Sequence, residues 1–356
     1  MISESAQSPR HQRPARFERF LFGVCYYPEH WTPEERREDA ARMAAAGVNV
    51  VRMGEFAWDR MEPRRGEFDF SLFEETILEM GRHGIDTILC TPTATPPRWL
   101  TLDQPGWMRV DADGRAMHHG SRQQCCTTND DFRAESRRIT SAMAGYFADN
   151  PRVIGWQTDN EFHCHFSECY CSACQAAFPR WLREKYGDIA SLNAAWGTAF
   201  WSQTYDAFEH VGLPRMLRPT YPNPGQHLDY LRFLSDATVE FQRQQVEILR
   251  RAQSRWWVTH NGVFNHLDYW TLTADLDFLG VDVYPQFAGE HPRDFIWASM
   301  LCETARAASG SFIVPEQQAG AGGQATYLHG TPCPGQMRLW SYQSIAHGAD
   351  GILHFR

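Results

Sequence analysis

Two glutamates stand where an apolar run turns polar, and carboxyl groups in such places could do acid–base chemistry. Glu161 follows Asn160 at the end of "VIGWQTDNE", and Glu316 lies near the end of "FIVPEQ". Two carboxylic acids that face each other across a pocket fit glycoside hydrolysis, in which one is the acid and the other the nucleophile or base. The plainer alternative is that each glutamate only pairs with an arginine. The presence of both, with an asparagine directly before Glu161, favours the chemistry.

Three thiols form the stretch "CYCSAC" a few residues after the first of these glutamates. Cys169, Cys171 and Cys174 have a CxC spacing followed by CxxC, which can wrap a tetrahedral metal site but needs one more ligand. Cys164 and His165 are nearby candidates. Free buried thiols or a disulfide pair are the alternatives, and the clustering favours a metal.

Eight short apolar runs, separated by longer amphipathic stretches, must position these residues. They are rich in Val, Ile and Leu without strict alternation, which is typical of strands buried on both faces of a parallel sheet. The runs begin at Phe20, Val48, Ile85, Val153, Trp256, Leu276, Phe312 and Gly351. The pattern predicts an α/β fold of the (β/α)₈ TIM barrel type. A doubly wound open sheet is disfavoured because no glycine-rich phosphate loop follows the first strand.

The spacing of the runs also predicts the domain organisation. Residues 1–16, a polar and basic leader, are expected to be disordered, and residues 17–356 to form the barrel. The connection after the fourth strand, about residues 162–255, is too long for one helix and predicts an inserted subregion. Within it, the irregular segment 200–226 is expected to lie over the barrel's mouth. The chain ends at the eighth strand, so we expect a barrel truncated before its last helix.

Composition and charge exclude several functions. The 356 residues carry a formal net charge of −9, and without a basic stripe this argues against nucleic-acid binding. No apolar run is long enough to span a bilayer. The leader lacks the apolar stretch of a secretory signal, which predicts a cytoplasmic protein. In that compartment ten cysteines indicate metal binding more than disulfides.

A barrel of this kind builds its active site at the carboxyl ends of its strands. Fourth and seventh strands lie on opposite sides of an eight-strand ring, so Glu161 and Glu316 can face each other. The acid needs a raised pKa, whereas the nucleophile must stay ionised, helped by a cation such as Arg52. Other polar residues near strand ends are Glu29, His30, Glu55, Asn160, His260, Asn261, Asp282, Tyr284 and Gln317. The absence of an HxxxH pair predicts no catalytic metal.

Seven stretches in a fixed order resemble glycoside hydrolase family 42, the β-galactosidases, from about Phe20 to Arg356. They are "GVCYYPEHW", "VVRMGEFAWDRMEPRRGEFDF", "TPTATPPRWL", "WQTDNEF", "CYCSAC", "LNAAWGTAFWSQTY" and "RLWSYQSIAHGADGILHFR". The resemblance implies hydrolysis of terminal, non-reducing β-D-galactosyl groups of β-galactoside oligosaccharides with retained configuration. It implies that this sequence covers the catalytic barrel, and we expect it to lack the family's downstream domains. A homo-trimer is a further expectation by analogy.

The resemblance also implies roles for individual residues. Glu161 would be the acid/base and Glu316 the nucleophile, while Asn160 would hold the sugar 2-hydroxyl. Arg52 would bind near the nucleophile and the sugar hydroxyls, and Tyr284 would donate a hydrogen bond to the nucleophile. The fourth ligand of a structural zinc site is placed at Cys126, beside Cys169, Cys171 and Cys174.

One stretch departs from the family pattern. Many members have a tryptophan shortly after the nucleophile, but here the sequence is "EQQAGAGGQATYLHG". Tyr327 is the candidate to take that place against the sugar. The departure leaves the sugar preference open, so α-L-arabinopyranosides and β-D-fucosides are alternative substrates. A carbohydrate-binding barrel fragment without turnover is the alternative from another class.

Overall fold

The computed structural model describes residue 17 and residues 19–356, except 103, 165, 216–220, 289–292, 322, 325, 326 and 329. The predicted leader, residues 1–16, therefore lies outside the described residues. Within the described ranges, no helix combines the length and apolar character needed to cross a membrane.

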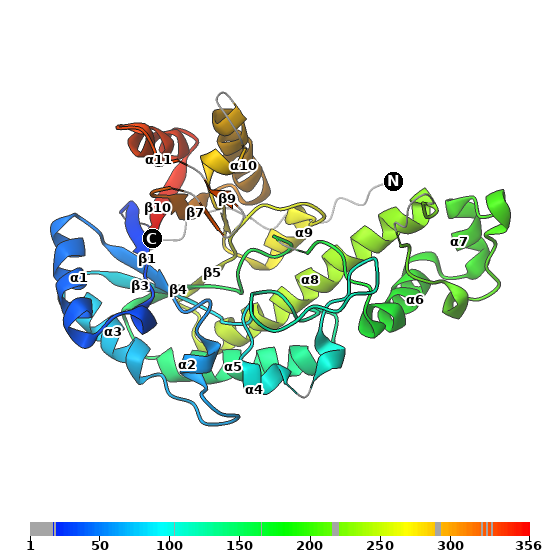
Figure 1. The fold of residues 1–356 in the computed structure, drawn as a ribbon, viewed down its shortest axis with the longest axis horizontal. Helices are drawn as coiled ribbons and strands as arrows, with labels where there is room; N and C mark the ends of the chain where they lie inside the picture. Colours follow the sequence, from blue (N-terminus) through cyan, green and yellow to red (C-terminus); the bar gives the residue numbers. More distant parts are fainter. Residues whose placement is uncertain are drawn as a thin grey trace.

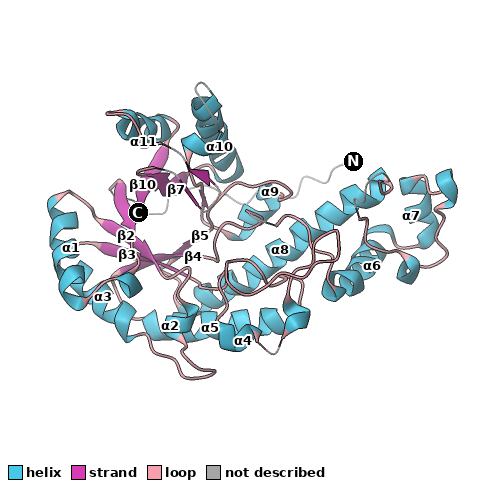
Figure 2. Ribbon diagram, in the orientation of Figure 1, coloured by secondary structure: helices cyan, strands magenta, loops and turns pink. Residues whose placement is uncertain are grey.

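Parallel strands form one large sheet that curls into a barrel, with helices packed around it (Figures 1 and 2). In the described part of the chain this sheet has eight strands in the order β5-β4-β3-β2-β1-β10-β7-β6. The strands are β1 (Leu21–Cys25), β2 (Val50–Met53), β3 (Asp86–Cys90), β4 (Val153–Gln157), β5 (Trp257–Thr259), β6 (Leu279–Gly280), β7 (Phe312–Gln318) and β10 (Ala349–Phe355). Each matches one of the eight predicted runs.

Hydrogen bonds between backbone groups bring the two edges of this sheet together. The Asp277 N–H donates to the Val258 carbonyl at 3.0 Å, and the Gly280 N–H donates to the His260 carbonyl at 2.7 Å. These bonds join β6 to β5 and close the ring. The predicted (β/α)₈ barrel is confirmed.

Helices begin and end where the sequence provides caps. Thr32 and Glu35 form a capping box at the start of α1, and Asn223 caps α8 ahead of Pro224, which satisfies backbone N–H groups that a helix start leaves free. The helices are α1 (Pro33–Ala45), α2 (Trp58–Met61), α3 (Ser71–Arg82), α4 (Arg98–Thr101), α5 (Asp130–Phe147), α6 (Ser172–Tyr186), α7 (Ile189–Trp196), α8 (Pro224–Ala252), α9 (Tyr269–Leu272), α10 (Arg293–Ser309) and α11 (Gln336–Ala346).

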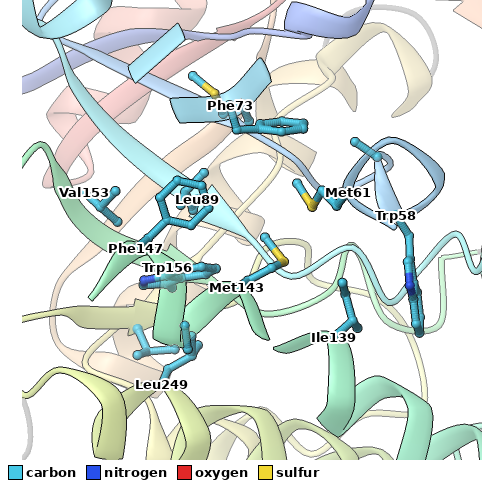
Figure 3. Close-up of a cluster of buried hydrophobic side chains, with 14 of the residues drawn as sticks. Trp58, Met61, Phe73, Leu89, Ile139, Met143, Phe147, Val153, Trp156 and Leu249 are labelled. Carbon is cyan, nitrogen blue, oxygen red and sulfur yellow. The ribbon is translucent and has the colours of Figure 1, made fainter. Parts of the chain in front are cut away.

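Apolar side chains fill both sides of the sheet. Inside the ring, residues from successive strands pack together, including Leu21, Val50, Ile88, Ile313 and Leu353. Between the sheet and its outer helices lies a larger core, part of which is drawn in Figure 3 with Trp58, Met61, Phe73, Leu89, Ile139, Met143, Phe147, Val153, Trp156 and Leu249 labelled. Because these cores fill the middle of the barrel and its outer side, polar side chains gather at the carboxyl ends of the strands.

The connection after β4 contains the inserted subregion that the sequence predicts. Helices α6 and α7 pack at the end of α8 that lies away from the strands (Figure 1). The segment expected over the barrel's mouth contacts these helices: the Asn193 side chain donates to the Tyr205 carbonyl, and the Gln226 side chain donates to the Gly212 carbonyl. Phe208 and Val211 are buried against α6 and α8, and the expected position over the barrel's mouth stays a prediction.

Candidate active site

The chain turns sharply after β4, and this turn presents the first glutamate. Asp159 and Glu161 have φ angles of 50° and 44°, a left-handed conformation that non-glycine residues rarely adopt. Hydrogen bonds hold the turn: the Gln123 side chain donates to the Asn160 carbonyl at 2.7 Å, and the Glu161 N–H donates to Asn261 at 3.0 Å. Such a conformation persists only where its surroundings fix it.

The two glutamates converge from different strands of the ring, and their carboxyl groups lie close together. Glu161 follows β4, Glu316 lies in β7, and each is buried. Carboxylate oxygens of Glu161, Glu316 and Asp282 all lie within 4.8 Å of one another. A separation of about 5–5.5 Å between the catalytic carboxyl groups is typical of retaining glycosidases, and about 6.5–9.5 Å of inverting ones. The close approach of these oxygens is compatible with the shorter of the two separations.

Arg52 is the centre of a hydrogen-bond network that joins three strand ends. From β2, its Nη1 lies 2.9 Å from Oε1 of Glu316, and its Nη2 donates to Oδ1 of Asn160 at 2.8 Å. Its Nε donates to Gln157 at 2.7 Å, and Nη1 also lies 3.2 Å from Glu55. A buried guanidinium whose three nitrogens all donate hydrogen bonds fixes the positions of its partners, and its positive charge favours their ionised forms.

Glu316 has further donors besides this arginine. The Tyr284 hydroxyl donates to Oε2 at 2.6 Å, and Nδ2 of Asn261 lies 3.3 Å from Oε1. Burial raises the pKa of Glu316, and the nearby Glu161 adds to this, whereas Arg52 and Tyr284 lower it. The cation and the hydroxyl therefore favour the ionised form that a nucleophile requires.

Glu161 is held by residues from two loops. Nη2 of Arg122 lies 2.8 Å from its Oε2, and Nδ2 of Asn160 donates to the same oxygen at 3.4 Å. The guanidinium of Arg122 also stands 5.7 Å from the ring centre of Phe56. Arg122 belongs to the loop between α4 and α5, so this loop takes part in the site.

The structure brings together Arg52, Asn160, Glu161, Tyr284 and Glu316, which sequence reasoning placed in the site. Tyr327, in the short strand β9 (Tyr327–Leu328) that pairs with β8 (Gly323–Gln324), has its side chain outside the described part of the structure, so its proposed role stays a prediction.

Sequence reasoning missed residues whose side chains complete the site. Arg122 and Gln123 lie in a loop without periodicity, and no pattern marked them. Asn261 and Asp282 stood among the strand-end residues without an assigned role. The strand-end position was the only signal available for them.

The four predicted thiols form one buried cluster. The Sγ atoms of Cys126, Cys169, Cys171 and Cys174 all lie within 4.8 Å of one another, with 3.5 Å between Cys126 and Cys174 and 3.8 Å between Cys171 and Cys174. Tetrahedral coordination with zinc–sulfur bonds of about 2.3 Å separates sulfur atoms by about 3.8 Å, so this donor set fits a metal ion. These distances exceed a disulfide bond of about 2.05 Å, and all ten cysteines are free.

Cys164 lies apart from this cluster, with its Sγ 3.8 Å from Arg122, and His165 is outside the described residues. The cluster connects the two loops that hold Glu161. Cys126 follows Arg122 and Gln123 in one loop, and Cys169 follows Glu161 in the other. A metal ion at the cluster would tie these loops together.

Sequence comparisons with known proteins agree on one family. The sequence model of glycoside hydrolase family 42, described as Beta-galactosidase, matches residues 25–356. Beta-galactosidase BgaH of Haloferax lucentense is 44% identical over 352 residues, covering 94% of this chain and 52% of that protein. A beta-galactosidase of Thermus thermophilus is 42% identical over 355 residues, covering 94% of this chain and 54% of that protein.

Solved structures agree with these sequence matches. The polyextremophilic beta-galactosidase from Halorubrum lacusprofundi superposes with a TM-score of 0.90 at 42% identity, covering 94% of this chain and 52% of that one. The catalytic domain of a beta-amylase from Paenibacillus polymyxa, at 13% identity and a TM-score of 0.67, shares the fold alone. The chain spans about half the length of the curated relatives it matches. The chain belongs to glycoside hydrolase family 42, the β-galactosidase family.

Proposed function

We propose that this protein releases terminal, non-reducing β-D-galactose from β-galactosides with retained configuration, with Glu316 as nucleophile and Glu161 as acid/base. The observation that carries the proposal is that one oxygen of each of these two buried carboxyl groups lies within 4.8 Å of the other, an approach suited to double displacement. Membership of the family and the names of its relatives support galactose as the sugar.

In the first step the Glu316 carboxylate attacks the anomeric carbon while Glu161 gives its proton to the glycosidic oxygen. The bond between sugar and aglycone breaks, and a galactosyl ester forms on Glu316. Arg52 and Tyr284, already bonded to this carboxylate, orient it for attack. Asn160, held by Arg52, is the proposed partner of the sugar 2-hydroxyl, whose hydrogen bonds strengthen in the transition state.

In the second step the Glu161 carboxylate takes a proton from water, and the resulting hydroxide attacks the anomeric carbon. The ester bond to Glu316 breaks and the carboxylate returns. Two inversions leave the configuration of the sugar unchanged. Arg122, which lies 2.8 Å from Glu161, positions the base in this half of the cycle.

A panel of nitrophenyl glycosides tests the sugar preference. We expect the highest kcat/KM with β-D-galactoside, and lower values with β-D-fucoside and α-L-arabinopyranoside, which share the axial hydroxyl but lack the 6-hydroxyl or the whole C6 group. A higher value for either alternative would reassign the substrate. Binding of galactose without turnover of any member of the panel would instead favour the non-catalytic carbohydrate-binding alternative.

We further propose that the four-thiol cluster holds a structural Zn²⁺ ion. Four thiolates leave no open position for water, so the ion would stabilise the loops and take no part in proton transfer. Buried free thiols are compatible with a reducing compartment, which supports a cytoplasmic location. A homo-trimer stays a prediction by analogy with the family, and sedimentation velocity would test it.

A further inference from the structure

A third carboxyl group lies in the same pocket, and the proposed double displacement gives it no role. Asp282 follows β6, is 6% exposed, and has an oxygen within 4.8 Å of both Glu161 and Glu316. Catalysis of this type needs only two carboxyl groups. The third must therefore be explained by what it contacts.

The two oxygens of Asp282 have different surroundings. Oδ2 accepts a hydrogen bond from Nδ2 of Asn261 at 2.6 Å, whereas Oδ1 is buried and has no donor among the described residues. One carboxylate oxygen of Asp282 lies within 4.8 Å of one of Glu161. Because ionised carboxylates only accept hydrogen bonds, such an approach is favourable only when one of the pair carries a proton. Since Oδ2 is already used, Oδ1 is the atom free to carry it.

The charges of the pocket point to the same conclusion. Two guanidinium groups face four carboxyl groups. Arg52 pairs with Glu55 and Glu316, and Arg122 pairs with Glu161. Asp282 has no ion-pair partner in the described ranges. An ionised carboxylate without a cation is costly to bury, and such a group instead takes up a proton.

The pKa of Asp282 is raised well above its usual value, first by burial and then by the charges of Glu316 and Glu161, against which Arg52 acts. Other titratable groups that interact with it come from the loop after β4, from α9 and from the loop after β6. They are Cys164, Tyr269 and Tyr284. These three groups are neutral at ordinary pH, so none of them offsets the negative charges nearby.

We propose that Asp282 is a positioning residue that works as a neutral acid, accepting a hydrogen bond from Asn261 and donating one to Glu161. This inference rests on the proposed function of Glu161. When Glu161 gives its proton to the leaving group, the Asp282 hydroxyl stabilises the carboxylate that forms. The proton of Asp282 stays on Asp282 throughout, because Glu161 regains its own proton from water in the second step.

The variants Asp282→Asn and Asp282→Ala separate this role from a general structural one. Asparagine is neutral and keeps a donor towards Glu161, so we expect kcat to stay within about threefold and the alkaline limb of the pH profile to stay in place. Alanine removes the donor, so kcat should fall about 10- to 100-fold with little change in KM, the loss expected for one hydrogen bond to a charged group. Its alkaline limb should move to higher pH.

An ionised Asp282 would give a different result with the same variants. The asparagine substitution would then remove a negative charge beside Glu161 and move the alkaline limb to lower pH. That result, or an Asp282→Asn variant as impaired as Asp282→Ala, would overturn the inference.

Infrared difference spectroscopy at pH 8 tests the protonation state without turnover. The spectrum of the unsubstituted chain minus that of Asp282→Asn should contain the carbonyl stretch of a protonated carboxylic acid. The control Asp277→Asn, at an aspartate paired with Arg250, should remove only carboxylate bands. A missing acid band in an active enzyme would overturn only the inference about Asp282. A chain that hydrolyses no glycoside would contradict the proposed function itself.

Discussion

Nη1 of Arg52 lies 2.9 Å from Oε1 of Glu316, and their side chains are 0% and 5% exposed. The same guanidinium donates to Asn160 and Gln157, so one side chain from β2 connects the proposed nucleophile to the end of β4. A charge buried in this way has little water to screen it. Arg52 therefore controls both the position and the ionisation of Glu316.

Replacing Arg52 should change the acid limb of the pH profile. Without the cation, the pKa of Glu316, which burial already raises, has less to hold it down, so Arg52→Gln should move the acid limb of kcat/KM to higher pH. Arg52→Lys keeps the charge but loses the planar guanidinium that donates to several partners at once. Its kcat should therefore fall, while its acid limb moves less. An equal shift in both variants would contradict the electrostatic role. The exposed Arg137, which bonds only to Gln244 in the described contacts, supplies the control Arg137→Gln.

The hydroxyl of Tyr284 should contribute to turnover through Glu316. Tyr284→Phe removes the donor 2.6 Å from Oε2, and a hydrogen bond to a charged group is worth about 1.5–3 kcal/mol. We expect kcat to fall about 10- to 100-fold, measured with an aryl galactoside at saturating concentration. Tyr342→Phe, at an exposed position of α11, is the matched control. Equal kcat values in the two variants would remove Tyr284 from the mechanism.

Stability should fall as the pH drops, because buried histidines are kept neutral. The His260 ring lies 2.7 Å from the Thr158 carbonyl through Nδ1, and its Nε2 accepts from the Phe162 N–H at 3.2 Å. Burial lowers the pKa of His260 to about 3 from 6.5. Below pH 6.5 the unfolded chain then binds more protons than the folded one, so stability present above pH 6.5 is lost on the way down to about pH 3.

The expected loss is up to about 1.4 kcal/mol per pH unit for this histidine. Urea unfolding at pH 7 and at pH 5 measures it, and His260→Gln, which can still donate and accept, should show a smaller difference between the two pH values. The exposed His210 offers the control His210→Gln. An unchanged difference in the His260 variant would show that another group causes the acid sensitivity.

Loss of the thiol cluster should lower stability before it changes catalysis. Cys171→Ser replaces a soft ligand at the proposed zinc site, and we expect Tm to fall by at least about 5 °C, a shift that corresponds to roughly 3–4 kcal/mol in a chain of this size. The pH profile of the remaining folded enzyme should be unchanged. Cys333→Ser, at an exposed thiol, is the control. Elemental analysis should find one zinc ion per chain, and metal-free protein with an unchanged Tm would contradict the proposed role.

Much of the fold was predictable because buried parallel strands leave a direct record in the sequence. The runs from Val48 and Phe312 coincide with β2 and β7, and the strand-end rule led to Glu161 and Glu316. Closure of the ring was less accessible, since it depends on two backbone hydrogen bonds between the short strands β5 and β6. Because these bonds join backbone groups, the side-chain sequence does not reveal which of them will form.

The rest of the site depends on contacts between distant loops. Arg122 contacts Glu161 although the two residues are 39 positions apart in the sequence. Nothing in the stretch "SRQQCC" indicates that the Arg122 side chain points towards Glu161. The protonation of Asp282 likewise depends on charges from three other strand ends. The packing of the segment after residue 200 was also not predictable, because Phe208 and Val211 are buried against α6 and α8 through contacts that the local sequence does not reveal.

The central claim is that Glu316 attacks the anomeric carbon while Glu161 handles the proton from the other side. Azide rescue tests both roles at once, with the configuration of the glycosyl azide determined by proton NMR. Glu316→Ala with azide should recover turnover of an activated β-galactoside and yield the α-galactosyl azide, because azide replaces the nucleophile in a single inversion. Glu161→Ala should yield the β-galactosyl azide, because azide replaces water in the second step. The opposite pair of products, or no rescue of either variant, would contradict the assignment.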